Sequence, residues 1–158
     1  TTPKAIELFE KHHVMTSVEL ASREEVGYEI YGKTINIEAR TMIDMAKKEI
    51  IPAVIKYTTT VASSIAAVEN VGGDASVQKI VLNDACTYLK QMNDALIVLE
   101  KATEKATTIE NAKERAIFYR DEVFTAMNGL RTPADNLEMI MDEKEWPFPT
   151  YGDLMFNV

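Results

Sequence analysis

Residues 28–68 read YEIYGKTINIEARTMIDMAKKEIIPAVIKYTTTVASSIAAV, and their apolar spacing decides the fold. Apolar or small side chains recur at steps of three and four residues from Tyr28 to Val68. An eleven-residue repeat of this kind corresponds to about 3.67 residues per turn, so the apolar stripe barely drifts around a nearly straight helix. Pro52 lies inside the stretch, and the stripe keeps its phase on both sides of it. We therefore predict one very long helix over residues 17–70, kinked near Pro52.

The segments around this helix also have helical patterns. Residues 1–15 indicate a short lead-in helix, and the spacing of Thr16 and Glu19 matches a capping box for the long helix. The turn at Gly72-Gly73 separates the long helix from a second helix over 75–104. A third helix is expected over 109–130, and Thr132-Pro133 indicates the start of a short helix over 133–142. The prediction is an all-α protein: one domain, 1–158, with three long helices in an antiparallel bundle and short terminal helices.

The chain ends in an aromatic segment, WPFPTYGDLMFNV, over residues 146–158. Pro147 and Pro149 fix their own backbone angles and disfavour helix in the residues before them, so this segment is predicted to be an extended tail. Tails that stay in solvent are usually poor in large apolar residues. We therefore expect this tail to dock on its own helices or on a partner, through Trp146, Phe148, Tyr151, Leu154 and Phe156.

Composition excludes several classes of function. The chain has 158 residues, of which 46% are hydrophobic and 27% charged, and its formal net charge is -8. An acidic surface is unsuited to nucleic acid and to anionic membranes, so neither is expected as a partner. We see no run of about eighteen apolar residues and no signal-peptide pattern, and there is one cysteine, so a cytoplasmic location is expected. Cys86 lies in an apolar helical stretch and is predicted to be buried filler.

No constellation of residues for chemistry emerges from the sequence. His12 and His13 are the only histidines, and Glu10 with His13 forms one Glu-x-x-His half motif of a di-iron bundle. A complete site of that kind needs a second such motif on another helix, so we interpret the histidines as a polar helix end. Cys86 and the serines have no separate base elsewhere in the chain. We predict no catalytic, cofactor-binding or metal-binding residue within these 158 residues.

Three long strings resemble the C-terminal region of type III glutamine synthetases, the large form found in many anaerobic and gut bacteria. They are LFEKHHVMTSVELASR (8–23), KTINIEARTMIDMAKKEIIPAV (33–54) and RTPADNLEMIMDEKEWPFPTYGDLMFNV (131–158). The resemblance extends over nearly the full length and is weakest over residues 71–110. It implies a non-catalytic helical domain of a glutamate–ammonia ligase, in which a preceding catalytic domain binds ATP, Mg or Mn, and glutamate. The implied partners are that catalytic domain and neighbouring subunits of a homo-oligomer.

No catalytic residue transfers from the resemblance to this chain. Arg23, Arg40 and Arg131 could reach toward an adjoining active site, but surface ion pairing is the favoured interpretation. The alternative function is a stand-alone helical adaptor or signalling bundle without catalysis. The sequence leaves open the oligomeric state, the helix faces that form interfaces, and whether a regulator binds.

Overall fold

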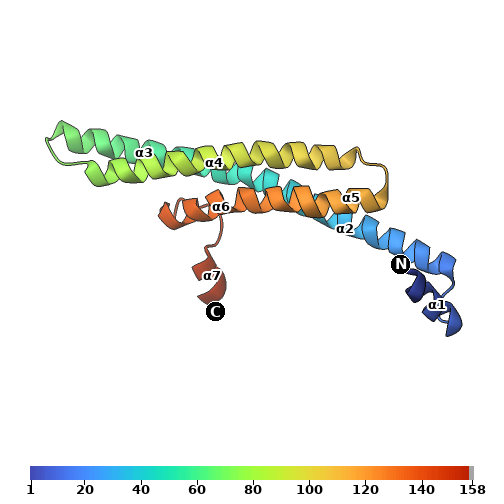
Figure 1. The fold of residues 1–158 in the computed structure, drawn as a ribbon. Coiled ribbons are helices and arrows are strands. Elements are labelled where there is room, and N and C mark those ends of the chain that lie inside the picture. Colours follow the sequence, from blue (N-terminus) through green and yellow to red (C-terminus); the bar gives the residue numbers. More distant parts are fainter. Residues whose placement is uncertain (157–158) are drawn as a thin grey trace.

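A computed structural model describes residues 1–156, with Tyr151 described by its backbone alone. The prediction of an all-α protein is confirmed, because every regular element in these residues is helical. In chain order the elements are α1 Pro3–Lys11, α2 Ser17–Met45, the π-helical turn η1 Ala46–Ile50, α3 Ile51–Asn70, α4 Ser76–Thr107, α5 Ala112–Phe118, the π-helical turn η2 Tyr119–Val123, α6 Phe124–Ile140 and α7 Tyr151–Phe156. Figure 1 shows an elongated arrangement in which the long helices lie side by side.

The long first helix runs without interruption from Ser17 to Asn70 through α2, η1 and α3. Its first turn has the expected capping box: the Thr16 amide donates to Glu19 Oε2 at 2.8 Å, and the Glu19 amide donates to Thr16 Oγ1 at 3.3 Å. Where the sequence predicts a kink near Pro52, the structure has the π turn η1, in which the Ile51 amide bonds to the Ala46 carbonyl five residues back. A wider turn at this point relieves the crowding of the proline ring against the preceding turn.

The helices pack through the apolar stripes that the sequence contains. Beyond the turn at Gly72, whose φ of 76° suits glycine, α4 returns along α3; the segment from α5 to α6 then runs back along α4 (Figure 1). The core consists of one connected cluster, and its largest fully buried side chains are Val54, Met92, Leu99, Val123, Leu130 and Leu137. At the other end α2 extends past this cluster and contacts α5 and α1.

The predicted boundary between a helix over 109–130 and a short helix over 133–142 is wrong. The helix after the α4–α5 turn begins at Ala112, where the Asn111 side chain accepts the Glu114 amide at 3.0 Å. It then continues through Pro133 to Ile140. The Thr132 hydroxyl donates to the Asn128 carbonyl within the helix and does not cap a new one. Packing outweighs the lost proline hydrogen bond because Pro133 is itself buried, one turn from the fully buried Leu137.

Two further predictions differ from the structure. The segment after Pro149 is not fully extended, because Tyr151–Phe156 forms the short helix α7. Thr150 and Asp153 cap it reciprocally: the Thr150 amide donates to Asp153 Oδ2 at 2.8 Å, and the Asp153 amide donates to Thr150 Oγ1 at 3.2 Å. Cys86 is exposed and not buried. Its neighbour Ala85 occupies the core-facing position, and consecutive helical residues point about 100° apart.

Candidate functional site: an apolar cavity beneath the C-terminal segment

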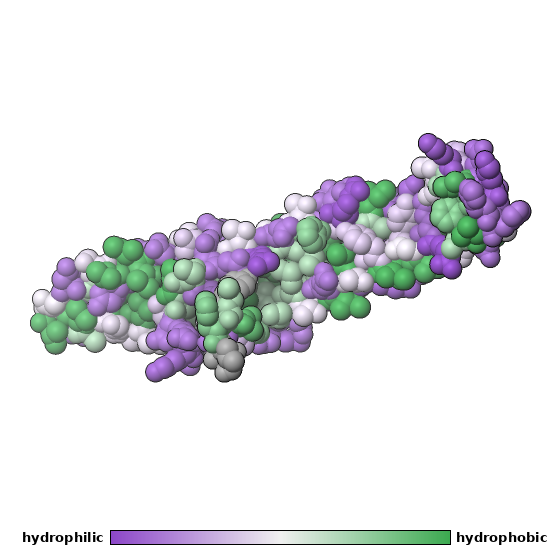
Figure 2. Space-filling view, turned by 90° about the horizontal axis from the view of Figure 1, so that it is seen from below, coloured by the Kyte–Doolittle hydropathy of each residue, from purple (hydrophilic) through white to green (hydrophobic). Residues whose placement is uncertain are grey.

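The C-terminal segment, residues 142–156, covers an apolar cavity on the side of the helical body, which consists of α2 to α6. The cavity has a volume of about 260 Å³. Four groups of residues line it: Met42, Met45, Ala46 and Ile50 from α2 and η1, Met92 from α4, Leu130, Arg131, Ala134, Asp135 and Glu138 from α6, and Trp146, Phe148, Pro149 and Leu154 from the C-terminal segment. The π turn η1 therefore forms part of one wall. Figure 2, seen from below, shows the hollow beside the projecting C-terminal segment.

A tight turn after α6 positions the aromatic part of the segment. The Asp142 carbonyl accepts the amides of Glu145 at 2.9 Å and of Trp146 at 3.1 Å. Trp146 and Phe148 are half-buried and pack against the core cluster, with their rings edge to face at a centroid distance of 6.5 Å and an angle of 78°. Lys56 on α3 forms an ion pair with Glu145 at 2.7 Å. The start of the segment is thus attached both to the core and to α3.

Tyr57 adds a second attachment at the end of α6. Its hydroxyl donates to the Ile140 carbonyl at 3.0 Å, which satisfies one of the last carbonyls of that helix. Burial raises the pKa of the Tyr57 phenol above its ordinary value, and the nearby Asp142 carboxylate acts in the same direction. The hydroxyl therefore stays protonated, and remains a donor, across the neutral range.

The predicted docking residues fall into two groups. Trp146 and Phe148 contact the core, whereas Leu154 is 70% exposed and Phe156 is 78% exposed, even though Leu154 reaches the cavity edge. The side chain of Tyr151 lies outside the part of the structure that is described. α7 projects from the body in Figure 1, and its described apolar side chains Leu154, Met155 and Phe156 are mostly exposed.

The chemistry of the cavity is that of a binding surface. Among its described lining residues, three carry charge, all from α6: Arg131, Asp135 and Glu138. Arg131 Nε lies 3.3 Å from Asp135 Oδ2, so this arginine forms a surface ion pair as expected. Arg40 donates to the Asn36 side chain at 3.2 Å, within its own helix. The lining suits an apolar side chain or a small apolar ligand and contains no paired nucleophile and base.

The two histidines lie away from this cavity. His12 caps the end of α1, and His13 follows it in a left-handed conformation with φ 53°. Within residues 1–156, no group of three or more His, Cys, Asp or Glu side chains is placed to hold a metal ion. Sequence reasoning did not find the cavity, because the wall formed by η1 depends on a π turn without a sequence signal.

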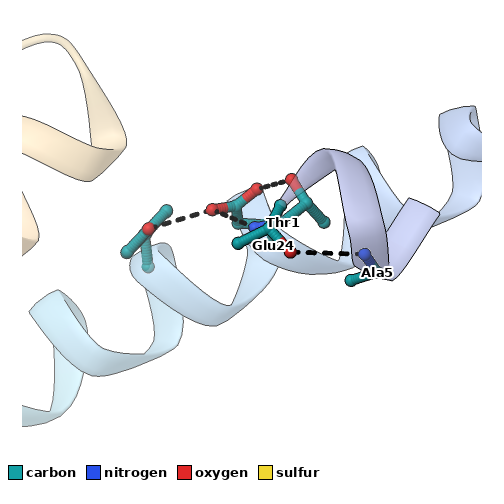
Figure 3. Close-up of polar contacts among 5 residues, drawn as sticks. Thr1, Ala5 and Glu24 are labelled. Carbon is teal, nitrogen blue, oxygen red and sulfur yellow. Dashed lines mark hydrogen bonds and ion pairs between the residues drawn. The ribbon is translucent and has the colours of Figure 1, made fainter. Parts of the chain in front are cut away.

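A separate polar cluster joins α1 to α2 near the N-terminus. The Thr1 ammonium lies 2.8 Å from Glu24 Oε1, and the Tyr28 hydroxyl donates to the same carboxylate at 3.0 Å (Figure 3). The hydrogen bond from the N-terminal ammonium, with those from the Thr1 and Tyr28 hydroxyls, lowers the pKa of Glu24 to about 2. These contacts hold Thr1 against α2, beside a shallow pocket of about 230 Å³ that Glu24 and Tyr28 help to line.

The continuous helix from Ser17 to Asn70 is long and apolar enough to span a membrane when judged by length and composition alone. Only 11% of its most apolar eighteen-residue window is buried. One such helix is weak support for a membrane segment, because soluble proteins contain helices that meet the same criterion. Val54 is the one fully buried residue of α3, so this helix has an uncovered face.

The described residues form an all-helical domain with an apolar cavity on its side. Residues 1–69 match the family model of the glutamine synthetase C-terminal domain. The chain is 29% identical to the type-3 glutamine synthetase of Dictyostelium discoideum over 97% of its length. It is 32% identical to a glutamine synthetase of Butyrivibrio fibrisolvens over 98%, and 27% identical to one of Bacteroides fragilis over 91%.

These matches confirm the resemblance to the C-terminal region of glutamine synthetases that the sequence shows. The chain spans only 22% of the length of the first two of these relatives and 21% of the third.

Proposed function

We propose that this chain is a non-catalytic helical domain that supports the catalytic domain of a glutamine synthetase and the assembly of its homo-oligomer. The observation that carries the proposal is the match of nearly the whole chain to about a fifth of each glutamine synthetase. The remaining length of those relatives has room for the catalytic machinery. The described residues of this chain, by contrast, offer packing surfaces and an apolar cavity.

The parent reaction in this proposal is the ATP-dependent ligation of ammonia to glutamate through a γ-glutamyl phosphate. Phosphoryl transfer of this kind depends on metal ions and on cationic groups that stabilise the charge of the transferred phosphoryl group. In our proposal ATP and Mg or Mn bind in the catalytic domain, and this domain holds neither. The wider setting we propose is cytoplasmic, with the catalytic domain and neighbouring subunits as partners and without nucleic acid or membrane.

The cavity has a specific part in this proposal. An adjoining catalytic domain or a neighbouring subunit would insert an apolar side chain beside Trp146 and Phe148, while Leu154 and Phe156 extend the contact outward. Interfaces are enriched in aromatic residues and methionine and poor in charge at their centres, which matches this lining. The C-terminal segment would then act as a clamp between the helical body and its partner.

The experiment compares three proteins: the chain alone, the full-length parent, and the parent lacking the region equivalent to residues 146–158. Glutamine formation from glutamate, ammonia and ATP is measured together with particle mass. We expect turnover from the parent, none from the chain alone, and loss of assembled particles in the truncated parent. Turnover by the chain alone would refute the non-catalytic role, and a truncated parent with unchanged particle mass would refute the clamp.

A further inference from the structure

The far end of the α3–α4 hairpin is nearly free of charge. We define the hairpin tip as residues 57–83, which comprise the end of α3, the turn and the start of α4. Its charged residues are Glu69, Asp74 and Lys79, for a net charge of -1 in a chain of -8. Lys79 is paired with Glu69 at 2.5 Å. The tip is therefore poor in charged residues, with 3 among its 27, against 27% in the whole chain.

In the part of the chain that the structure describes, the hairpin tip consists of two helices and no third helix covers them. α6 ends at Ile140, whose carbonyl accepts the Tyr57 hydroxyl at the start of the tip, and α3 packs mainly on α4 beyond that point. Among the apolar residues of the tip, Ala75 alone is fully buried. A helix that packs on one neighbour leaves part of its surface unburied, and here that surface exposes Val71, Val77 and Ile80 among hydroxyl and small residues.

The exposed face of the tip has both a groove and projecting side chains. The groove has a volume of about 340 Å³ and is lined by Tyr57, Thr60, Val61, Ser64, Val77, Gln78 and Val81. Val77 is 68% exposed and Ile80 is 60% exposed, one turn apart on α4. Figure 2 shows hydrophobic side chains gathered at this end of the molecule.

We propose that the hairpin tip is a self-association surface, on which the tips of two copies of this chain pack into an antiparallel four-helix bundle. A helical hairpin is half of such a bundle, and two hairpins with apolar seams complete it. In a two-fold arrangement the same patch serves both copies, so the ridge of Val77 and Ile80 faces the groove of the other copy.

Charge selects a second copy over other occupants. A basic protein partner would be steered by an acidic patch, whereas the tip is close to neutral. A membrane surface is bound through lysine and arginine around an apolar face, and the one lysine of the tip is paired with Glu69. The tip of another copy has the matching composition, and tip-to-tip packing holds the two acidic bodies at opposite ends.

The size of the patch sets the expected strength. Two helix ends of this length bury less than the ~800 Å² per partner of a typical stable interface. We therefore expect a reversible dimer with a Kd on the order of 10–100 µM. Because the repulsion between the acidic bodies is screened by salt, raising NaCl from about 0.05 to about 0.5 M should tighten the dimer.

The test is sedimentation equilibrium of the 158-residue chain, with a reductant present to keep Cys86 as a thiol. Val77→Glu and Ile80→Glu place a like charge in the proposed seam, and each should raise the Kd at least about tenfold. Val98→Glu is the matched control: the same change on the same helix, outside the tip, at a residue that is 57% exposed. It should leave the Kd within about twofold. Circular dichroism melting confirms that the variants fold.

Three results would overturn the inference: a chain that stays monomeric at about 500 µM, a dimer that Val98→Glu weakens as much as Val77→Glu, or a dimer that weakens with salt. Binding to phosphatidylcholine vesicles that Val77→Glu abolishes would show a membrane as the occupant instead. The inference deepens the assembly role proposed above and rests on it for its biological meaning. The two fail separately, because turnover by the chain alone refutes the proposed function, whereas an inactive, monomeric chain refutes the self-association.

Discussion

Removing the Trp146 ring tests whether the C-terminal segment stabilises the helical body. A fully buried tryptophan removes about 150–250 Å² from water, so the half-buried Trp146 ring accounts for roughly 120 Å². At ~25 cal/mol per Å² that burial corresponds to about 3 kcal/mol. This is an upper value, because the unfolded chain already buries part of its apolar surface. We therefore expect Trp146→Ala to lower the free energy of unfolding by about 2 kcal/mol.

The assay is thermal unfolding followed by circular dichroism at 222 nm, with urea unfolding as a second measurement. For a chain of this size, about 2 kcal/mol corresponds to a decrease in Tm of roughly 4–8 °C. Phe148→Ala should act in the same direction, since its ring packs against both the core and Trp146. The matched control is Phe156→Ala in the same segment, whose side chain is mostly in solvent and whose loss should change stability by under about 0.5 kcal/mol.

The comparison within the segment decides the outcome. If Trp146→Ala leaves both the Tm and the urea midpoint unchanged, the aromatic residues do not stabilise the body and the clamp has no anchor. If Phe156→Ala lowers the free energy of unfolding as much as Trp146→Ala does, then α7 packs on the body. The division of the segment into an anchored part and an exposed part would then be wrong.

Three further changes test local features. Gly129→Ala should stabilise by about 0.5–1 kcal/mol and raise the Tm, because a methyl group there meets no atom within 4 Å in the middle of α6; an unchanged or lower Tm would contradict this. In a protein that begins at Thr1, Glu24→Gln should lower the Tm at pH 7 but not near pH 2. The Thr1 ammonium lowers the folded pKa of Glu24 to about 2, so the stability that this carboxylate contributes is present above its unfolded pKa of 4.5 and is lost as pH falls from 4.5 to about 2. Tyr57→Phe should cost about 1 kcal/mol at neutral pH through loss of the bond to the Ile140 carbonyl. Burial raises the Tyr57 pKa, so the stability that the neutral phenol gives is lost as pH rises through that pKa, and the gap between the variant and the parent in pH-dependent urea unfolding should narrow in alkali.

Much of the fold could be predicted from the sequence because the apolar stripes and the end signals agree. The buried positions Ile35, Ala39, Ala46 and Ile50 lie on the stripe that the sequence contains, and the capping box at Thr16 is formed. Such patterns reflect burial directly, so they identify the core face of each helix without knowledge of its neighbours.

The errors arose where a local signal competed with packing. Thr132-Pro133 is a strong helix-start signal, yet the buried phase of α6 continues through it to Leu137. Pro147 and Pro149 led to the prediction of an extended tail, although the residues that follow them include the capping pair of Thr150 and Asp153. At Pro133 the choice between two local structures depended on contacts distant in the chain, whereas α7 is capped by a local pair that the sequence already contained.

The π turns were beyond sequence reasoning for a different reason. A π turn inserts one residue between hydrogen-bonded partners, which shifts the helix face by about 100° and resembles ordinary scatter in an apolar stripe. In η2 this turn places Tyr119 against the buried face of α2, where its ring lies 3.3 Å from the position of a Gly32 Cβ. The small residue at Gly32 therefore has a packing reason that became visible only when the two elements were seen together.

The distribution of charge connects the fold to the proposed assembly. In the helical body the charged residues lie on faces that point to solvent, as the exposed pairs Lys33–Glu29 and Lys90–Asp94 illustrate. In the hairpin tip, the exposed helix faces carry Val77 and Ile80 with hydroxyl and small residues, and 3 of the 27 tip residues are charged. Exposure alone predicts charge at both places, so the difference needs a second cause. Burial of this surface in the proposed assembly would supply that cause, because charge at the centre of an interface must be desolvated and is therefore depleted there.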